Sequence, residues 1–279
     1  MKYILYNPLS NNGKGELALK QLQEIYKDEE VTEQSIINLD LKSFVSSLKE
    51  DDEIVITGGD GTIHCFINEL DGVCPSNKVW YYASGSGNDF CKDIGKKKGD
   101  IILLNEYLVN LPYCIVNGIK KYFIDNIGYG IDGYVCEEAD KIKKRSSKPI
   151  NYTMIALKGL LFFFKRKKVK LIVDGVEHNF EQAWFAPTMH GRYFGGGMKV
   201  APDQKRNTGI LSTIIFSCKS KLKTLFIFPE IFKGTHVFHT KNCFVFTGKD
   251  IEVTFNEPCA LQIDGETYLN VTGYKAHID

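Results

Sequence analysis

The sequence predicts two domains of different class, an α/β domain followed by an all-β sandwich. Strand-like and helix-like segments alternate through the first third of the chain, which is typical of a mostly parallel sheet with helices on both faces. Later, pairs of strand-like runs meet at Asn-Gly or Asp-Gly, the pattern of antiparallel hairpins. A chain of 279 residues, 43% of them hydrophobic, is long enough for two cores. We place the domains at 1–118 and 119–279.

The elements of the first domain are predicted from hydrophobic periodicity. The expected strands are Lys2–Tyr6, Val31–Asn38, Glu53–Thr57 and Val79–Ala83. Each is followed by a helical pattern; the helices are Gly15–Tyr26, Leu41–Leu48, Thr62–Leu70 and a helix that starts at Asn88-Asp89. In an open α/β sheet, ligands bind beyond the carboxyl ends of the strands. The loops that follow these strands are therefore the candidates for a site.

The second domain is predicted to consist mainly of hairpins. Tyr113–Val116 and Lys120–Ile127 flank Asn117-Gly118, and Val169–Val173 and Val176–Phe180 flank Asp174-Gly175, so that both turns read as type I′. Further strands are expected at Ile210–Phe216, Cys243–Thr247, Ile251–Phe255 and Ala260–Ile263, and helices at Asn151–Phe164 and Lys221–Lys233. The C-terminal tail is expected to be able to pack back on the first domain.

Composition excludes several classes of protein. The formal net charge of +1 points to no polyanionic partner. The eight cysteines form no CxxC pairs, which favours reduced thiols in the cytoplasm. The N-terminal MKYILYNP lacks the apolar region of a signal peptide, and the most apolar run, Met154–Phe164, is too short to span a bilayer. We therefore expect a cytoplasmic protein.

Three loops after the expected strands carry few bulky side chains. They are 7–16 (NPLSNNGKGE), 56–62 (ITGGDGT) and 83–90 (ASGSGNDF). Glycines let a backbone approach a ligand closely, and the free N–H groups of such turns favour an anion, above all phosphate. Asp60 would repel a phosphate directly, so it fits only through a cation or an ordered hydrogen-bond donor, and Mg²⁺ suits the first of these. We expect the three loops to line one crevice.

The motif GGDGT alone has two interpretations. It could equally be a tight strand-to-helix turn with Asp60 as the helix N-cap. The other two loops favour a phosphate site, because Lys14 offers a point charge and 83–90 adds two more glycines. No loop matches GxxxxGK[ST] or gives a clean GxGxxG after a Rossmann strand, which argues against a P-loop NTPase and a dinucleotide fingerprint.

Later segments add to these loops: 126–135 (NIGYGIDGYV), 193–203 (YFGGGMKVAPD) and 261–266 (LQIDGE). With them, the chain resembles the diacylglycerol-kinase catalytic family, which includes bacterial lipid kinases, sphingosine and ceramide kinases and, distantly, NAD kinases. The resemblance covers nearly the whole chain in family order. GSGNDF and DGE favour the lipid kinases over the NAD kinases.

The resemblance implies a phosphofructokinase-like N-terminal domain, a C-terminal β-sandwich, and an active site between them that transfers phosphate from ATP to a lipid hydroxyl. Asp264 of the DGE motif would be the general base. Asp60 would organise Mg–ATP, and the resemblance does not clearly separate it from Asp264 as the candidate for the base. Glu266 would help to hold the metal or the nucleotide. Asp132 would face the polar head of the acceptor. The residues implied to contact ATP are Asn7, Lys14, Gly58, Gly59, Gly61, Thr62, Gly85, Ser86, Gly87, Asn88 and Glu266.

The chain departs from the family pattern at several positions. His64-Cys65 replaces an Asn-Glu pair, and Ala83 and Ser86 replace Pro and Thr. The segment 207–212 (NTGILS) lacks the acidic residues that support a structural Mg²⁺ in bacterial members, so no second metal site is expected. Two alternatives stay open: an NAD-kinase-like or other small-molecule kinase, and a non-catalytic relative that binds lipid or nucleotide. Asp264-Gly265 could also be an ordinary surface hairpin turn.

A basic segment could serve membrane contact. From 141 to 170 there are eleven Lys or Arg residues and no Asp or Glu, and Leu160–Phe164 (LLFFF) lies within this run. The aromatics could pack in the core beneath a solvated basic face, or the segment could dock peripherally on an anionic membrane. Nucleic acid is not expected, because the aromatics are consecutive and no RNA-binding signature is present. The expected partners are a lipid alcohol and a membrane surface, and a homodimer is left open.

Overall fold

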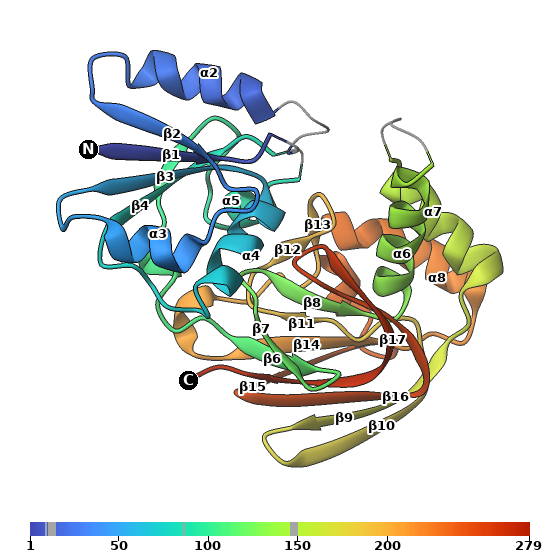
Figure 1. Cartoon of the computed structure of the whole chain (residues 1–279). Helices are drawn as coiled ribbons and strands as arrows, with labels where there is room; N and C mark the ends of the chain where they lie inside the picture. The colour runs from blue at the N-terminus through green and yellow to red at the C-terminus, as the bar shows by residue number, and fades with distance from the viewer. Residues whose placement is uncertain (9, 11–14, 86, 146–149) are drawn as a thin grey trace. The chain divides into compact units, whose positions relative to one another are not determined.

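The computed structural model describes residues 1–8, 10, 15–85, 87–145 and 150–279 (Figure 1). The chain divides into two compact units, Met1–Leu111 and Pro112–Asp279, and each is described by itself. The boundary lies before the hairpin turn that contains Gly118, and not after it as the sequence predicted. Both strands of that hairpin belong to the sheet of the second unit, so their mutual hydrogen bonds keep them in one unit.

The N-terminal unit is an α/β layer structure, as the sequence predicted. Its five-stranded sheet has the order β2-β1-β3-β4-β5, and the first four strands are parallel. The strands are β1 (Lys2–Tyr6), β2 (Val31–Ser35), β3 (Glu53–Gly58), β4 (Lys78–Ala83) and β5 (Ile101–Leu103). The helices are α2 (Gly15–Ile25), α3 (Leu41–Ser47), α4 (Asp60–Glu69), α5 (Asp89–Asp93) and the 3₁₀ turn η1 (Asn105–Tyr107). Figure 1 shows α2 on one face of the sheet and α3 and α4 on the other.

The apolar pattern of the sequence explains this packing. Leu22 of α2 and the strand residues Ile4 and Val55 are fully buried in one cluster, because the apolar stripe of α2 faces the sheet. The expected strand Val31–Asn38 ends early at Ser35, and Asn38 has a positive φ of 60°. The prediction of alternating strands and helices is confirmed, with errors of only a few residues at the ends.

The C-terminal unit is rich in antiparallel strands. Its large sheet has the order β15-β14-β11-β8-β16-β17-β6-β7, and β9, which carries β10 on its other edge, also pairs with β16. The strands are β6 (Tyr113–Val116), β7 (Ile119–Tyr122), β8 (Asn126–Tyr129), β9 (Lys167–Val173), β10 (Val176–Ala183), β11 (Thr188–Met189), β14 (Leu211–Phe216), β15 (Cys243–Gly248), β16 (Asp250–Ile263) and β17 (Glu266–His277). A separate ribbon joins β12 (Tyr193–Phe194) to β13 (Met198–Lys199).

The predicted hairpin turns are confirmed. Asn117 and Gly118 have φ values of 50° and 79°, and Asp174 and Gly175 have values of 47° and 83°. Two successive positive φ values define the type I′ geometry that Asn-Gly and Asp-Gly favour. A third turn of this kind, Asp264-Gly265, joins β16 to β17.

Two expectations for this unit need correction. Lys120–Ile127 is not one strand, because it breaks into β7 and β8. Ile251–Phe255 and Ala260–Ile263 are parts of the single strand β16, whose pairing register shifts around Cys259. The C-terminal strand β17 lies between β16 and β6 in the second sheet. That the tail packs back on the first domain stays a prediction.

Helices cover part of the C-terminal unit. They are α6 (Ile131–Lys143), α7 (Tyr152–Lys158), the π-helical turn η2 (Gly159–Phe163), the 3₁₀ turn η3 (Arg206–Thr208), α8 (Lys221–Ile227) and the 3₁₀ turns η4 (Phe228–Phe232) and η5 (Thr235–Phe238). Buried residues such as Ile131, Leu160 and Ile227 pack with Trp184 in one cluster. The two helices expected at 151–164 and 221–233 are confirmed, but α6 was not predicted. Over the residues that the structure describes, no helix is both long and apolar enough to cross a membrane.

Candidate functional site

The three glycine- and polar-rich loops of the N-terminal unit follow β1, β3 and β4, which are neighbours in the sheet. Because these strands are parallel, their carboxyl ends meet at one edge, where α/β proteins bind ligands. GGDGT spans the end of β3 and the start of α4, with Gly59 as the N-cap residue and Asp60 in the first helical turn.

The second and third loops are bonded to each other. The backbone N–H groups of Ser84 and Gly85 both donate to the Gly58 carbonyl, at 2.9 and 2.8 Å. The Asp89 N–H donates to Asp60 Oδ2 at 2.8 Å. A Cβ atom on Gly85 would lie 2.4 Å from the Gly59 Cα, so the two loops approach more closely than side chains allow. The predicted convergence of these two loops is confirmed.

Other residues of the three loops are also closely packed. A Cβ on Gly15 would lie 1.9 Å from the Asn7 carbonyl oxygen, so α2 starts directly against the end of β1. A Cβ on Gly58 would lie 1.9 Å from Thr62 Oγ1. Asn88 adopts a left-handed conformation and donates from Nδ2 to the Gly85 carbonyl at 2.8 Å. Lys14 and Ser86 lie outside the described residues.

Two consequences follow for chemistry at this edge. The first turn of α4 offers N–H groups that no helical carbonyl accepts, and these favour an anion such as phosphate. Asp60 lies in the same turn, with Asp89 in hydrogen-bond contact through its N–H. Backbone donors beside carboxylates suit a phosphate that carries a divalent cation.

Replacing Gly85 tests how tightly the two loops meet. Gly85→Ala is expected to lower the free energy of unfolding of the protein by about 1–3 kcal/mol, because the new methyl group overlaps Gly59. Gly87→Ala is the matched control, since its Cβ would meet Asp60 Oδ2 at 3.5 Å, an ordinary contact. Urea unfolding measures both variants. Equal stability of the two variants would contradict the close approach.

The motif NIGYGIDG of the C-terminal unit joins β8 to α6, and its glycines have steric causes. A Cβ on Gly128 would lie 1.5 Å from Asp132 Oδ2, so the missing side chain leaves room for that carboxylate. A Cβ on Gly133 would lie 1.9 Å from the Ala260 carbonyl, which shows how closely α6 packs on β16. Gly130 has a φ of 99°, which favours glycine. The motif therefore positions Asp132.

Asp264 lies in the β16–β17 turn and is buried. Its Oδ2 accepts the N–H of Ile124 at 2.8 Å, and its Oδ1 accepts those of Asp125 and Asn126, both at 2.9 Å. The prediction of a hairpin turn is correct, but the residue is not a surface residue. Three charge-assisted hydrogen bonds hold the carboxylate in one orientation against the segment before β8.

A buried polar cluster around the same segment was missed by sequence reasoning. The Arg206 guanidinium forms an ion pair with Asp125 and also donates to the Ile124 carbonyl; both charged side chains are more than nine-tenths buried. Burial, and secondly the charge of Arg206, lowers the pKa of His190 to about 4, so its ring is neutral at neutral pH, and Nδ1 lies 2.9 Å from the Ile124 carbonyl. No local motif joins these residues, and only the fold brings them together.

Gln262 connects the two carboxylates that were predicted in this unit. Its Nε2 donates to Asp132 Oδ2 at 2.8 Å, and its Oε1 accepts the N–H of Gly265 at 2.6 Å. Asp132 and the Asp264-Gly265 turn are thus parts of one hydrogen-bonded arrangement. Glu266, the first residue of β17, is exposed. Asp60 and Glu266, the two predicted metal ligands, lie in different units.

Comparison with known proteins identifies the family. Residues 2–110 match the model of the diacylglycerol kinase catalytic domain, and residues 125–274 match that of the YegS C-terminal NAD kinase beta sandwich-like domain. The two models follow each other and together cover most of the chain. The chain therefore belongs to the diacylglycerol kinase family.

Individual relatives agree with this membership. Diacylglycerol kinase of Mycobacterium tuberculosis is 27% identical over 198 residues, 68% of this chain and 62% of the relative, so the match spans less than two thirds of that protein. Diacylglycerol kinase of Bacillus subtilis is 26% identical over 79% of this chain and 73% of its own length. A crystal structure of a Bacillus anthracis diacylglycerol kinase superposes with a TM-score of 0.69 at 19% identity, covering 99% of this chain and 93% of that one, and shows the same fold.

Proposed function

We propose that this chain is an ATP-dependent lipid kinase that transfers the γ-phosphate to the hydroxyl group of diacylglycerol or a related lipid alcohol. The observation that carries the proposal is the bonded contact between GGDGT and the GSGND loop at the carboxyl ends of β3 and β4. Family membership supports the same class of reaction.

The N-terminal unit would bind the nucleotide. Backbone N–H groups of Gly59 and Gly61 at the start of α4 would face the phosphates, as is usual at helix N-termini. The Thr62 N–H already donates to the Gly59 carbonyl at 2.8 Å, so Thr62 would contact the nucleotide through its side chain. Asp60, with Asp89 beside it, fits Mg²⁺, because this ion takes one or two carboxylates and fills its other positions with phosphate oxygens and water. No group of three or more His, Cys, Asp or Glu side chains suited to a metal occurs among the described residues. When bound, Mg²⁺ would neutralise charge on the phosphates.

Asp264 would act as the general base of the C-terminal unit. The lipid oxygen would form a bond to the γ-phosphorus while the bond to the β-phosphate oxygen breaks, and the hydroxyl proton would pass to Asp264. The three backbone donors keep this carboxylate in place before the reaction, and a positioned base contributes about 10²–10⁴-fold to the rate. Asp132, bonded to Gln262, would bind the polar head of the acceptor. Glu266 is kept as a proposed contact to metal or nucleotide.

We propose peripheral membrane association in the cytoplasm as the way to the acceptor. The basic segment 141–170 offers fewer unpaired positive charges to a membrane than its sequence suggests, because five of its lysines form ion pairs with acids outside the segment. These are Lys141, Lys143, Lys167, Lys168 and Lys170. The remaining described basic residues without such a pair are Lys144, Arg145, Lys158, Lys165 and Arg166, and Arg166 donates to the Cys218 carbonyl.

Acceptor profiling tests the function. The protein is incubated with Mg²⁺, ATP labelled in its γ-phosphate, and in parallel diacylglycerol, ceramide, sphingosine or NAD. The label is expected in the lipid extract, with diacylglycerol as the best acceptor. NAD is the second candidate, because an NAD kinase of Archaeoglobus fulgidus shares the fold with a TM-score of 0.50. Label on NAD alone would replace the proposal, and label on none of the acceptors would support a non-catalytic relative.

A further inference from the structure

Four large apolar side chains of the C-terminal unit are strongly exposed. Phe162 and Phe163 are 73% and 65% exposed, and Leu222 and Phe226 are 67% and 73% exposed. We call these four residues the insertion face. Single exposed apolar residues are normal, but four large ones on two neighbouring elements indicate a surface that is covered in use.

The insertion face is built on two elements that are bonded together. Phe162 and Phe163 lie in η2, and Leu222 and Phe226 lie one helical turn apart in α8. The Lys221 ammonium donates to the Leu161 carbonyl at 2.8 Å, which ties α8 to η2. Figure 1 shows α8 beside the segment that follows α7.

The backbone under this face is fixed. Leu160 and Phe164 are buried in the same core cluster as Ile227 of α8, so both elements are anchored. The Phe164 N–H donates to the Gly159 carbonyl at 2.9 Å, a bond to the fifth residue before it that marks a π turn. The prediction that the LLFFF aromatics pack in the core is therefore correct for Phe164, while Phe162 and Phe163 are exposed on an ordered scaffold.

The charges near the face are cationic. Lys158 and Lys165 flank η2, and Lys219 and Lys223 lie before and within α8. None of these four lysines forms an ion pair with a described residue. The five paired lysines of the basic segment lie on α6 and β9 instead. Apolar side chains among uncompensated lysines are the pattern of a surface that binds anionic bilayers.

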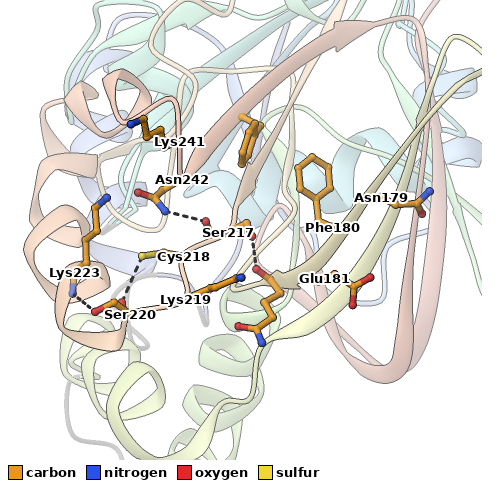
Figure 2. A pocket seen from close by; sticks show the side chains of 12 residues that line it. Asn179, Phe180, Glu181, Ser217, Cys218, Lys219, Ser220, Lys223, Lys241 and Asn242 are labelled. Carbon is orange, nitrogen blue, oxygen red and sulfur yellow. Dashed lines mark hydrogen bonds between the residues drawn. The ribbon is translucent and has the colours of Figure 1, made fainter.

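A cavity of about 500 Å³ lies beside α8 and continues this positive region (Figure 2). Lys219, Lys223 and Lys241 line it together with Ser220 and Asn242. Among the described lining residues Glu181 is the single acid, and it is paired with Lys168 at 2.7 Å. The cavity therefore offers several cationic donors, whose chemistry fits a phosphate group.

We propose that the insertion face enters the interface of an anionic bilayer while the phosphate of a lipid headgroup occupies the lysine-lined cavity beside it. This inference rests on the proposed lipid-kinase function only because that function explains why the protein would approach a bilayer. The occupant is a lipid surface, because an apolar patch bordered by lysines without ion pairs is complementary to anionic headgroups above acyl chains. A second copy of this chain would bring like charges together at the same border.

Vesicle sedimentation of the full chain, without ATP or acceptor, tests the proposal. Vesicles of phosphatidylcholine alone are compared with vesicles that also contain phosphatidylglycerol. F162S/F163S and L222S/F226S are each expected to weaken binding to anionic vesicles at least about tenfold at low and at high salt, because each removes two inserted side chains. K219Q/K223Q/K241Q is expected to weaken binding mainly at low salt. V176S/I119S, at exposed residues beside two hairpin turns, is the matched control and is expected to bind like the wild type.

Other occupants would give different results. Unchanged vesicle binding by both apolar variants would overturn the insertion face. A change from dimer to monomer in light scattering, with vesicle binding unchanged, would assign the face to a second copy. Inorganic phosphate is also added to the vesicle-bound protein. If it releases the protein at the concentration at which it occupies the cavity, the cavity is a site for free phosphate. Because binding is measured without turnover, its failure alongside intact lipid phosphorylation in detergent micelles would overturn this inference and leave the proposed function standing.

Discussion

Asp264→Asn is expected to lower the kcat of lipid phosphorylation by about 10²–10⁴-fold, because the amide cannot accept the proton of the attacking hydroxyl. The substitution also has a structural effect. The carboxylate accepts three backbone N–H groups, and an amide in its place turns its own NH₂ towards at least one of them. One lost bond at a buried donor lowers the free energy of unfolding by about 1–3 kcal/mol.

The chain contains a matched control for this prediction. Asp174 occupies an Asp-Gly turn with the same φ of 47° as Asp264, and its Oδ1 accepts the N–H groups of Lys249 and Asp250 at 2.9 and 2.8 Å. Asp174→Asn therefore removes the same charge at an exposed turn of the same geometry, to which we assign no function, and its amide oxygen can still accept both N–H groups. It is expected to change stability little and to leave kcat at the wild-type level. Activity per folded molecule, with folding measured by circular dichroism, separates the two effects. If both variants keep wild-type kcat, Asp264 is a structural residue and not the base.

Arg206→Met is expected to have the largest effect on stability, a loss of about 3–5 kcal/mol in the free energy of unfolding. The substitution leaves the Asp125 carboxylate buried without its cation, and it removes the donor to the Ile124 carbonyl. Urea unfolding at neutral pH measures the change.

A second variant makes the interpretation specific to the ion pair. Asp125→Asn in the Arg206→Met background removes the uncompensated charge, and so it is expected to recover a large part of the lost free energy. Both variants are also expected to lower kinase activity per folded molecule, because Asp125 belongs to the segment that holds Asp264. A loss below about 1 kcal/mol on Arg206→Met, a value typical of an exposed pair, would contradict the burial of this cluster.

The sequence predicted the parts of the site that depend on local order. GGDGT and GSGND each follow a buried strand and open a helix, and parallel pairing of β3 and β4 then brings them together. Likewise, Asn117-Gly118, Asp174-Gly175 and Asp264-Gly265 form the turns of the hairpins in which they lie. In these cases the chemical information lies within a few residues, which is why the expected and observed elements agree.

Long-range partners could not be predicted in this way. Arg206 and Asp125 lie far apart in the chain, and nothing in the segment 203–212 marked an arginine that would be buried. The α6 helix was missed because its first turn, IDGY, carries a glycine that the packing against β16 requires and that helices disfavour. The free positive charge of the basic segment 141–170 was overestimated because the acids that pair with its lysines come from other segments of the chain.

The central claim, phosphate transfer from ATP to a lipid hydroxyl, is tested most directly by identifying the product. The full chain is incubated with Mg²⁺, ATP and vesicles that contain diacylglycerol, and the extracted lipid is analysed by mass spectrometry. Phosphatidic acid, formed in equal amount to ADP, is the expected result. Unchanged diacylglycerol, with ATP either intact or hydrolysed to inorganic phosphate, would contradict the account.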